Sequence, residues 1–165
     1  MIIDEDIVAG GVTPFIITKL IERHERERQR YRLLHDYYMG DHRILSRRKR
    51  GKNVANNRIM CNHAKYITDM TQSYLVGNPV TYAVSDEYDI EAIKNEYLEQ
   101  DMPSVDSEIV KNMSIYGKAY ELIYADEKSK PRSVRLDPEH TFVCYSQSAF
   151  EKPLFAVYYL SLIHI

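Results

Sequence analysis

Two kinds of hydrophobic spacing divide the chain. Up to about residue 116, apolar residues recur every three or four positions, which is typical of amphipathic helices. From residue 118 onward they alternate with polar residues, which is typical of strands. The sequence therefore predicts an α+β fold in which a helical segment is followed by an antiparallel β-meander.

The first predicted helix begins at Pro14 and ends before Gly40. Thr13 is a suitable N-cap, Pro14 fits the first helical position, and Gly40 stops the apolar pattern. The middle of this helix, residues 22–30 (ERHERERQR), is polar on all sides and offers Glu–Arg pairs four residues apart. We expect a long helix whose middle is partly exposed to solvent.

Shorter elements follow. We expect helices over residues 64–75, after Ser85 and from Pro103, with Gly77 ending the first of them. A short strand at 80–84 is expected between the first two. The strands expected in the meander cover residues 120–124, 133–136, 141–145 and 154–160.

Charge is segregated along the chain, although the net charge is only -2. Residues 85–110 contain nine acids and one base, Lys94, whereas residues 42–68 contain no acid. Such asymmetry allows the basic segment of one subunit to face the acidic segment of a neighbour. It is equally compatible with two solvated surfaces.

The basic segment includes a long connection, residues 41–58, which we call the basic arm. It has no sustained hydrophobic period, and connections of this length are usually functional or disordered. Clustered Arg and Lys can neutralise phosphates without reading base sequence. A solvated loop, a subunit-interface clamp and a DNA contact all remain open. The candidate nucleic-acid or subunit-interface residues are Arg43, Arg47, Arg48, Lys49, Arg50, Lys52 and Arg58.

Patterns for catalysis or cofactor binding are weak. The chain has no G-x-x-x-x-G-K-[ST] loop and no H-E-x-x-H. Zinc binds residues of the types found at Cys61, His63, His140 and Cys144, but their spacing matches no known finger. We therefore expect no enzyme, no metal site and no cofactor. The apolar stretch 154–165 is shorter than the ~20 residues of a membrane-spanning helix, so no membrane role is expected.

Five short motifs, in order, resemble the portal proteins, or head-to-tail connectors, of long-tailed phages of Gram-positive bacteria. The motifs are YYMGDH (37–42), NNRIM (56–60), YLVGNPV (74–80), YGKAYE (116–121) and LDPEHTFVCY (136–145). The resemblance spans most of the chain. It implies a structural subunit of a ring at the capsid vertex, through which DNA is packaged and ejected.

The resemblance also implies location and partners. Twelve copies would form the ring at the portal vertex of the virion, after assembly in the bacterial cytoplasm. Its partners would be terminase, scaffolding protein, the major capsid protein, head-completion proteins and double-stranded DNA. This chain would correspond to an incomplete wing-like region, because the family's chains are considerably longer.

The resulting division has an N-terminal long helix (1–40), the basic arm (41–58) and a truncated α+β wing-like domain (59–160). Residues 161–165 (SLIHI) depart from the family pattern, and we interpret them as a sequencing artefact. An alternative function is a freestanding nucleic-acid-binding domain that uses the basic arm. The acidic second half of the chain counts against this alternative.

Overall fold

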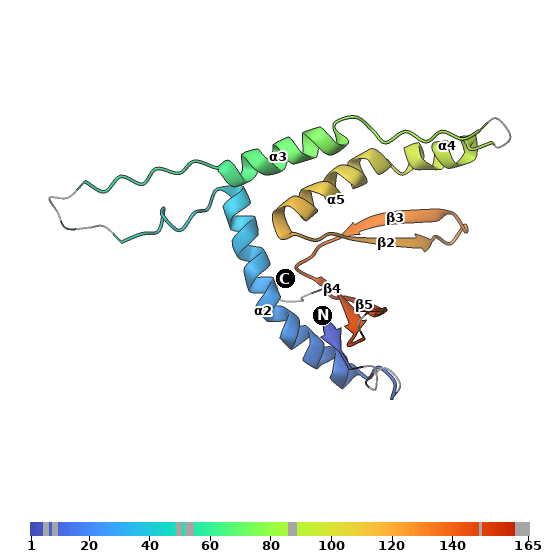
Figure 1. The fold of residues 1–165 in the computed structure, drawn as a ribbon, viewed down its shortest axis with the longest axis horizontal. Helices are drawn as coiled ribbons and strands as arrows, with labels where there is room; N and C mark the ends of the chain where they lie inside the picture. Colours follow the sequence, from blue (N-terminus) through green and yellow to red (C-terminus); the bar gives the residue numbers. More distant parts are fainter. Residues whose placement is uncertain are drawn as a thin grey trace. The chain divides into compact units, whose positions relative to one another are not determined.

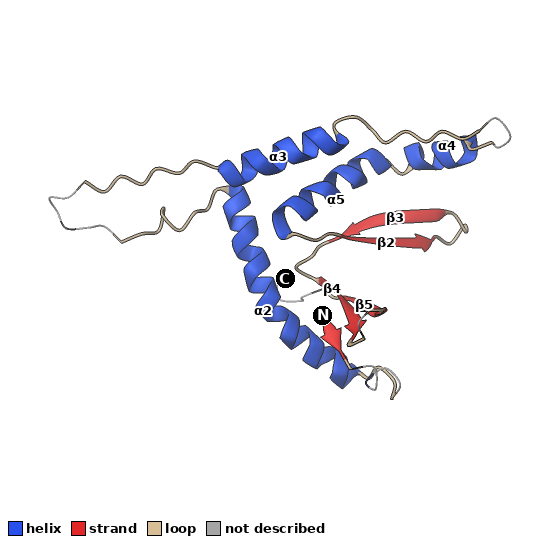
Figure 2. Cartoon of the chain, viewed as in Figure 1, coloured by secondary structure: helices blue, strands red, loops and turns tan. Residues whose placement is uncertain are grey.

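A computed structural model describes residues 1–4, 7, 10–48, 51, 55–85, 89–148 and 150–160 (Figure 1). Helices and strands are both well represented (Figure 2), which confirms the α+β class. The chain forms two compact units: unit 1 is Met1–Arg32 with Leu136–Ile165, and unit 2 is Leu33–Arg135. The elements in order are β1 (Ile2–Ile3), α2 (Pro14–Met39), α3 (His63–Val76), α4 (Glu91–Glu99), α5 (Met102–Tyr116), β2 (Tyr120–Ala125), β3 (Pro131–Leu136), β4 (Thr141–Ser146) and β5 (Pro153–Tyr158).

Unit 1 is built on a three-stranded sheet in the order β1-β4-β5. The central strand β4 runs parallel to β1 and antiparallel to β5. Its apolar side chains Phe142 and Cys144 are buried together with Ile3 of β1 and Leu20 of α2. These four residues form the apolar core of the unit.

The polar middle of α2 is partly exposed, as predicted, but two of its polar side chains are buried. His24 is fully buried, and its Nδ1 lies 2.9 Å from the Tyr159 hydroxyl. Arg28 is also buried and donates hydrogen bonds to Glu25 and to Nε2 of His140. Buried polar groups are tolerated when they are hydrogen-bonded, and periodicity alone does not reveal such pairing.

In unit 2, helices α3 and α5 lie side by side (Figure 1), and hydrogen bonds between polar side chains join them. The Ser114 hydroxyl donates to the Thr68 hydroxyl at 3.1 Å, and the Gln72 amide donates to the Ser107 hydroxyl at 2.7 Å. Thr68 is buried. The seam between these helices is therefore held by hydrogen bonds.

Strands β2 and β3 form a separate hairpin in unit 2 (Figure 2). Asp126 closes its turn, because one carboxylate oxygen accepts from the backbone N–H groups of Lys128 and Lys130, each at 2.9 Å. The Lys130 N–H, and to a smaller extent the Arg132 guanidinium, hold the pKa of Asp126 below its usual value. The negative form of Asp126 thus stabilises this turn.

Other elements differ from prediction. The expected single meander is instead two sheets, and the strand expected at 80–84 is absent from the described structure. A strand needs a neighbour for its backbone hydrogen bonds, and β-propensity does not supply one. Helix α4 begins at Glu91 and not soon after Ser85, and the carboxylate of Asp89 accepts from the Glu91 N–H at its start. The two-residue β1 is too short for periodicity to detect.

Candidate interface site

The base of the basic arm is closed by one asparagine. The Asn62 side chain donates to the Tyr38 carbonyl at 2.9 Å, and its oxygen accepts from the Lys65 N–H at 3.0 Å. It therefore caps α3 and ties it to the end of α2. Gly40 ends α2 with a φ of 88°, and a Cβ there would lie 3.1 Å from the Met60 methyl carbon. The backbone conformation favours glycine at this position, and a Cβ would also crowd the end of the Met60 side chain.

Lys65, beside the arm, is already neutralised. Its ammonium donates to Asp69 at 2.8 Å and to the Tyr38 hydroxyl at 3.3 Å, and it lies 4.9 Å from the centre of the Tyr38 ring. The hydrogen bond from Lys65 lowers the pKa of Asp69, and the same bond raises the pKa of Lys65. Lys65 therefore stabilises the base of the arm and is poorly placed to bind a phosphate.

Arg58 has a structural position within the arm. Its guanidinium donates to the carbonyls of Leu45 and Arg47, each at 2.6 Å. These bonds cross-link the outgoing and returning limbs of the arm. Among the predicted site residues, Arg58 thus stabilises the backbone of the arm that carries the other arginines.

The remaining described site residues are Arg43, Arg47 and Arg48. All three are exposed, and none forms an ion pair with a carboxylate in the described part of the chain. Lys49, Arg50 and Lys52 lie outside the described residues. Among the predicted interface residues that the structure describes, these three arginines can therefore bind an anionic surface of another molecule.

The acidic segment is partly compensated within unit 2. Glu91 pairs with Lys94 at 2.9 Å, while Lys130 pairs with Glu99 at 3.0 Å and Glu96 at 3.5 Å. The hydrogen bond to Glu99 raises the pKa of Lys130. Residues 89–101 carry five carboxylates, against three cations that lie in this segment or form ion pairs with it, so the segment keeps a net negative charge. These residues are Asp89, Glu91, Glu96, Glu99 and Asp101 against Lys94, Lys130 and Arg132.

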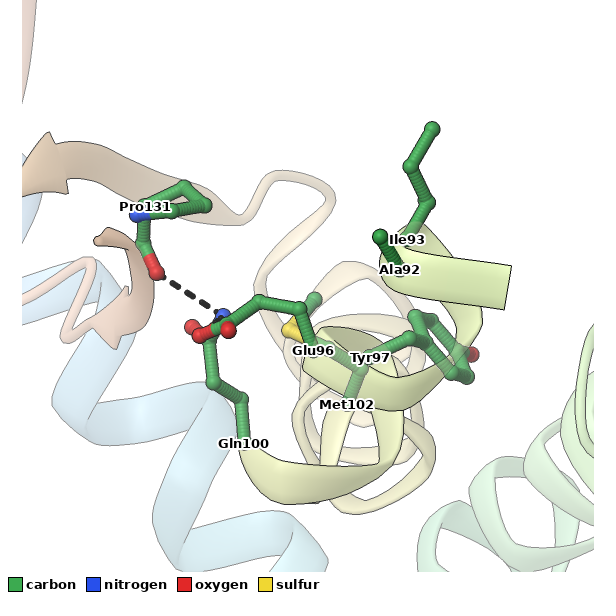
Figure 3. Close-up of a pocket in the computed structure, with 7 residues that line it drawn as sticks. All are labelled: Ala92, Ile93, Glu96, Tyr97, Gln100, Met102 and Pro131. Carbon is green, nitrogen blue, oxygen red and sulfur yellow. Dashed lines mark hydrogen bonds between the residues drawn. The ribbon is translucent and has the colours of Figure 1, made fainter. Parts of the chain in front are cut away.

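A hollow of about 370 Å³ lies beside α4 within unit 2 (Figure 3). Its apolar lining comes from α4, the start of α5 and the start of β3. Figure 3 shows Gln100 reaching Pro131, whose carbonyl accepts from the Gln100 amide at 2.9 Å, with Glu96 beside it. The lining residues are Ala92, Ile93, Glu96, Tyr97, Gln100, Met102 and Pro131. Sequence reasoning missed this hollow, because residues from three elements form it.

Metal chemistry and membrane insertion find no support in the described residues. They contain no cluster of three or more His, Cys, Asp or Glu side chains suited to a metal. Cys61 is exposed, whereas Cys144 is buried, and burial raises the pKa of the Cys144 thiol. None of the helices in the described ranges has the length and apolarity needed to cross a bilayer.

Comparison with known proteins then decides the family. A sequence model described as "Phage portal protein, SPP1 Gp6-like" matches residues 17–163, which include most of both units and the whole basic arm. The chain belongs to this phage portal protein family. The portal protein of Bacillus phage SPP1 is 31% identical over 158 residues, an alignment covering 88% of this chain. The family has a structural role, which fits the expectation that the chain is not an enzyme.

The chain spans 30% of the length of the SPP1 portal protein. The family assignment confirms the resemblance carried by the five motifs. The structure adds a local role for parts of them: Gly40 in YYMGDH ends α2, and Arg58 in NNRIM braces the arm. The DNA or subunit contacts of the candidate arginines stay a prediction.

Proposed function

We propose that this chain serves as part of a portal subunit, in a dodecameric ring at one capsid vertex through which double-stranded DNA is packaged and ejected. The observation that carries the proposal is the portal-family match over residues 17–163. The chain would supply a wing-like region of that subunit. The division into a long helix (1–40), an arm (41–58) and a wing-like domain (59–160) belongs to the same proposal.

The proposed partners follow from this role. Scaffolding protein and the major capsid protein would surround the ring during assembly in the bacterial cytoplasm. Terminase would dock for packaging, and head-completion proteins would follow it. These contacts are proposed for the complete subunit.

For the basic arm we propose an electrostatic contact with the neighbouring subunit of the ring. Exposed Arg43, Arg47 and Arg48 support this role, because Arg58 and Asn62 fix the limbs that carry them. Lys49, Arg50 and Lys52 add positive charge by sequence. Clustered cations that meet a negative surface give orientation to an assembly more than raw affinity.

The test is double charge reversal in the full-length protein. Arg47→Glu with Arg48→Glu should raise the protein concentration needed for ring formation, most strongly at low salt, since screening weakens the contact in any case at high salt. The matched control is Lys128→Glu with Lys152→Glu, which makes the same charge change at exposed lysines outside the arm. Analytical ultracentrifugation and electron microscopy would measure assembly.

The outcomes separate the possible roles of the arm. Rings that form normally but lose packaged DNA would assign the arm to DNA. Normal rings with normal packaging would show a solvated arm. A full-length protein that never forms rings, and binds DNA as a monomer or dimer with steep salt dependence, would favour the freestanding nucleic-acid-binding alternative.

A further inference from the structure

The large apolar side chains of helix α3 lie on the face that points away from α5 and not on the face that packs against it. The side chains directed at α5 include Thr68 and Gln72, which are polar and hydrogen-bonded. The opposite face carries Tyr66, Ile67, Met70 and Tyr74, all more than half exposed, with Tyr74 90% exposed. An amphipathic surface helix normally directs its apolar stripe inward.

This outward apolar stripe needs a covering surface. Contiguous exposed apolar patches on soluble proteins usually mark contacts with other molecules. Tyr66, Met70 and Tyr74 are spaced four residues apart and therefore lie along one line of the helix. A row of large side chains on a rigid helix is a ridge that fits a groove or hollow.

The hollow beside α4 is a complementary surface in the same unit. Ile93, Met102 and Pro131 give it apolar walls, and Met102 can adapt to the shape of an inserted side chain. Glu96 supplies a carboxylate at its edge (Figure 3). An aromatic side chain with a hydroxyl group suits such a hollow, because its ring packs while its hydroxyl donates to the carboxylate.

We infer that the α3 ridge of one copy of this chain packs into the α4 hollow of the next copy. The inference rests on the proposed ring. In a closed ring each subunit uses two different surfaces, one for each neighbour. Unit 2 presents such a pair, an exposed row of large side chains on α3 and an apolar hollow beside α4.

Charge supports a second copy as the occupant. The ridge adjoins the base of the basic arm, and because its own Asp69 is ion-paired with Lys65, the positive charge on this side comes from the arm. The hollow belongs to the segment where Asp89, Glu91, Glu96, Glu99 and Asp101 outnumber the nearby cations. When the ridge of one copy meets the hollow of another, the basic arm lies near the acidic segment. Two ridges in contact would instead bring two basic arms together.

Cross-linking between copies tests the contact directly. In full-length protein carrying Cys61→Ser, the single variants Tyr74→Cys and Ile93→Cys would be prepared apart, mixed before assembly and oxidised. A disulfide-linked dimer should form strongly in the mixture and weakly in either variant alone. The control mixture pairs Tyr74→Cys with Phe150→Cys, since Phe150 is 94% exposed and belongs to unit 1.

Assembly of a second variant gives independent evidence. Tyr74→Glu should raise the concentration for half-maximal ring formation at least tenfold, while Phe150→Glu should leave it within twofold. Because Tyr74 is exposed within the single chain, thermal unfolding of unassembled Tyr74→Glu should match that of wild type.

The results distinguish this inference from the proposed function. Rings that assemble normally with Tyr74→Glu and give no more cross-link than the control would overturn the contact. The ridge would then be covered by another part of the subunit or another protein, while the ring proposal would stand. Wild-type protein that forms no ring would overturn both.

Discussion

Unit 1 has a buried apolar cluster beside its buried polar side chains, whereas the described part of unit 2 has no such cluster. In unit 1, Phe142, Cys144, Leu20 and Ile3 are buried together. In unit 2, the buried side chains among the described residues are the polar Thr68 and Asn112, while large apolar side chains such as Ile67 and Leu98 are exposed. Apolar burial is the main favourable contribution to folding.

The difference indicates that the units obtain stability in different ways. Unit 1 buries its apolar residues within one chain. In unit 2, Thr68 is hydrogen-bonded to Ser114, the buried side-chain nitrogen of Asn112 has no partner among the described residues, and large apolar side chains stay exposed. Binding that occurs only to the folded form adds stability by mass action, so assembly should stabilise unit 2 more than unit 1.

The largest effect is expected from Phe142→Ala. The Phe142 ring is 2% exposed and lies 4.9 Å from the His24 ring, so its removal leaves a cavity in the core of unit 1. The free energy of unfolding should fall by about 3–5 kcal/mol. The matched control in unit 2 is Leu98→Ala, which should change it by no more than about 0.5 kcal/mol in the unassembled chain. Urea denaturation would measure both, and equal losses would contradict the comparison.

A smaller loss is expected from Tyr159→Phe. This substitution removes the hydroxyl that lies 2.9 Å from Nδ1 of buried His24 but keeps the ring. The same hydroxyl donates to the Glu139 carbonyl at 3.4 Å, so the loss of both hydrogen bonds should cost about 1–2 kcal/mol. Tyr158→Phe, at an adjacent half-exposed residue of β5, is the control and should be neutral. A neutral result for Tyr159→Phe would show that the network adds nothing to unit 1.

The polar seam of unit 2 should tolerate apolar replacement. Thr68→Val combined with Ser114→Ala removes both partners of one hydrogen bond while nearly preserving shape. The double variant should change the free energy of unfolding by less than about 1 kcal/mol, whereas each single variant leaves one hydroxyl without this bond and should cost more. A double variant less stable than both singles would show that the seam depends on its polar pairing.

The smallest effect concerns pH and the β2–β3 turn. The pKa of Asp126 is lowered in the folded chain, so its stabilisation is complete above the usual aspartate pKa and is lost as pH falls through the lowered value. The amides of Lys128 and Lys130 should therefore exchange faster as pH falls from about 5 to about 2, after correction for intrinsic exchange. Asp126→Asn should abolish this pH response, and an unchanged response would assign it to another carboxyl.

Local signals account for most of the elements. Thr13, Pro14 and Gly40 define α2, and alternating residues locate β2 to β5, because caps and side-chain periods are properties of short segments. The meander and the strand at 80–84 were wrong because strand pairing depends on distant residues. Burial of His24 and Arg28 likewise depends on Tyr159 and His140, more than 100 positions away.

The candidate site was predictable in composition but not in geometry. The basic arm follows from its charges, its length and Gly51. The structural role of Arg58 could not be predicted from the sequence. Its hydrogen bonds to the carbonyls of Leu45 and Arg47 exist only once the arm folds back on itself. The α4 hollow needs residues as distant as Ile93 and Pro131 to meet.

Gln100 has a consequence for how the hairpin meets other chains. Its side-chain amide accepts from the Ser133 N–H at 2.9 Å and donates to the Pro131 carbonyl, occupying the two backbone groups that a further strand would use. A short amide thus protects part of the β3 edge against the edge-to-edge pairing that leads to aggregation. In the proposed ring, each subunit would meet its neighbours with this part of the β3 edge already closed.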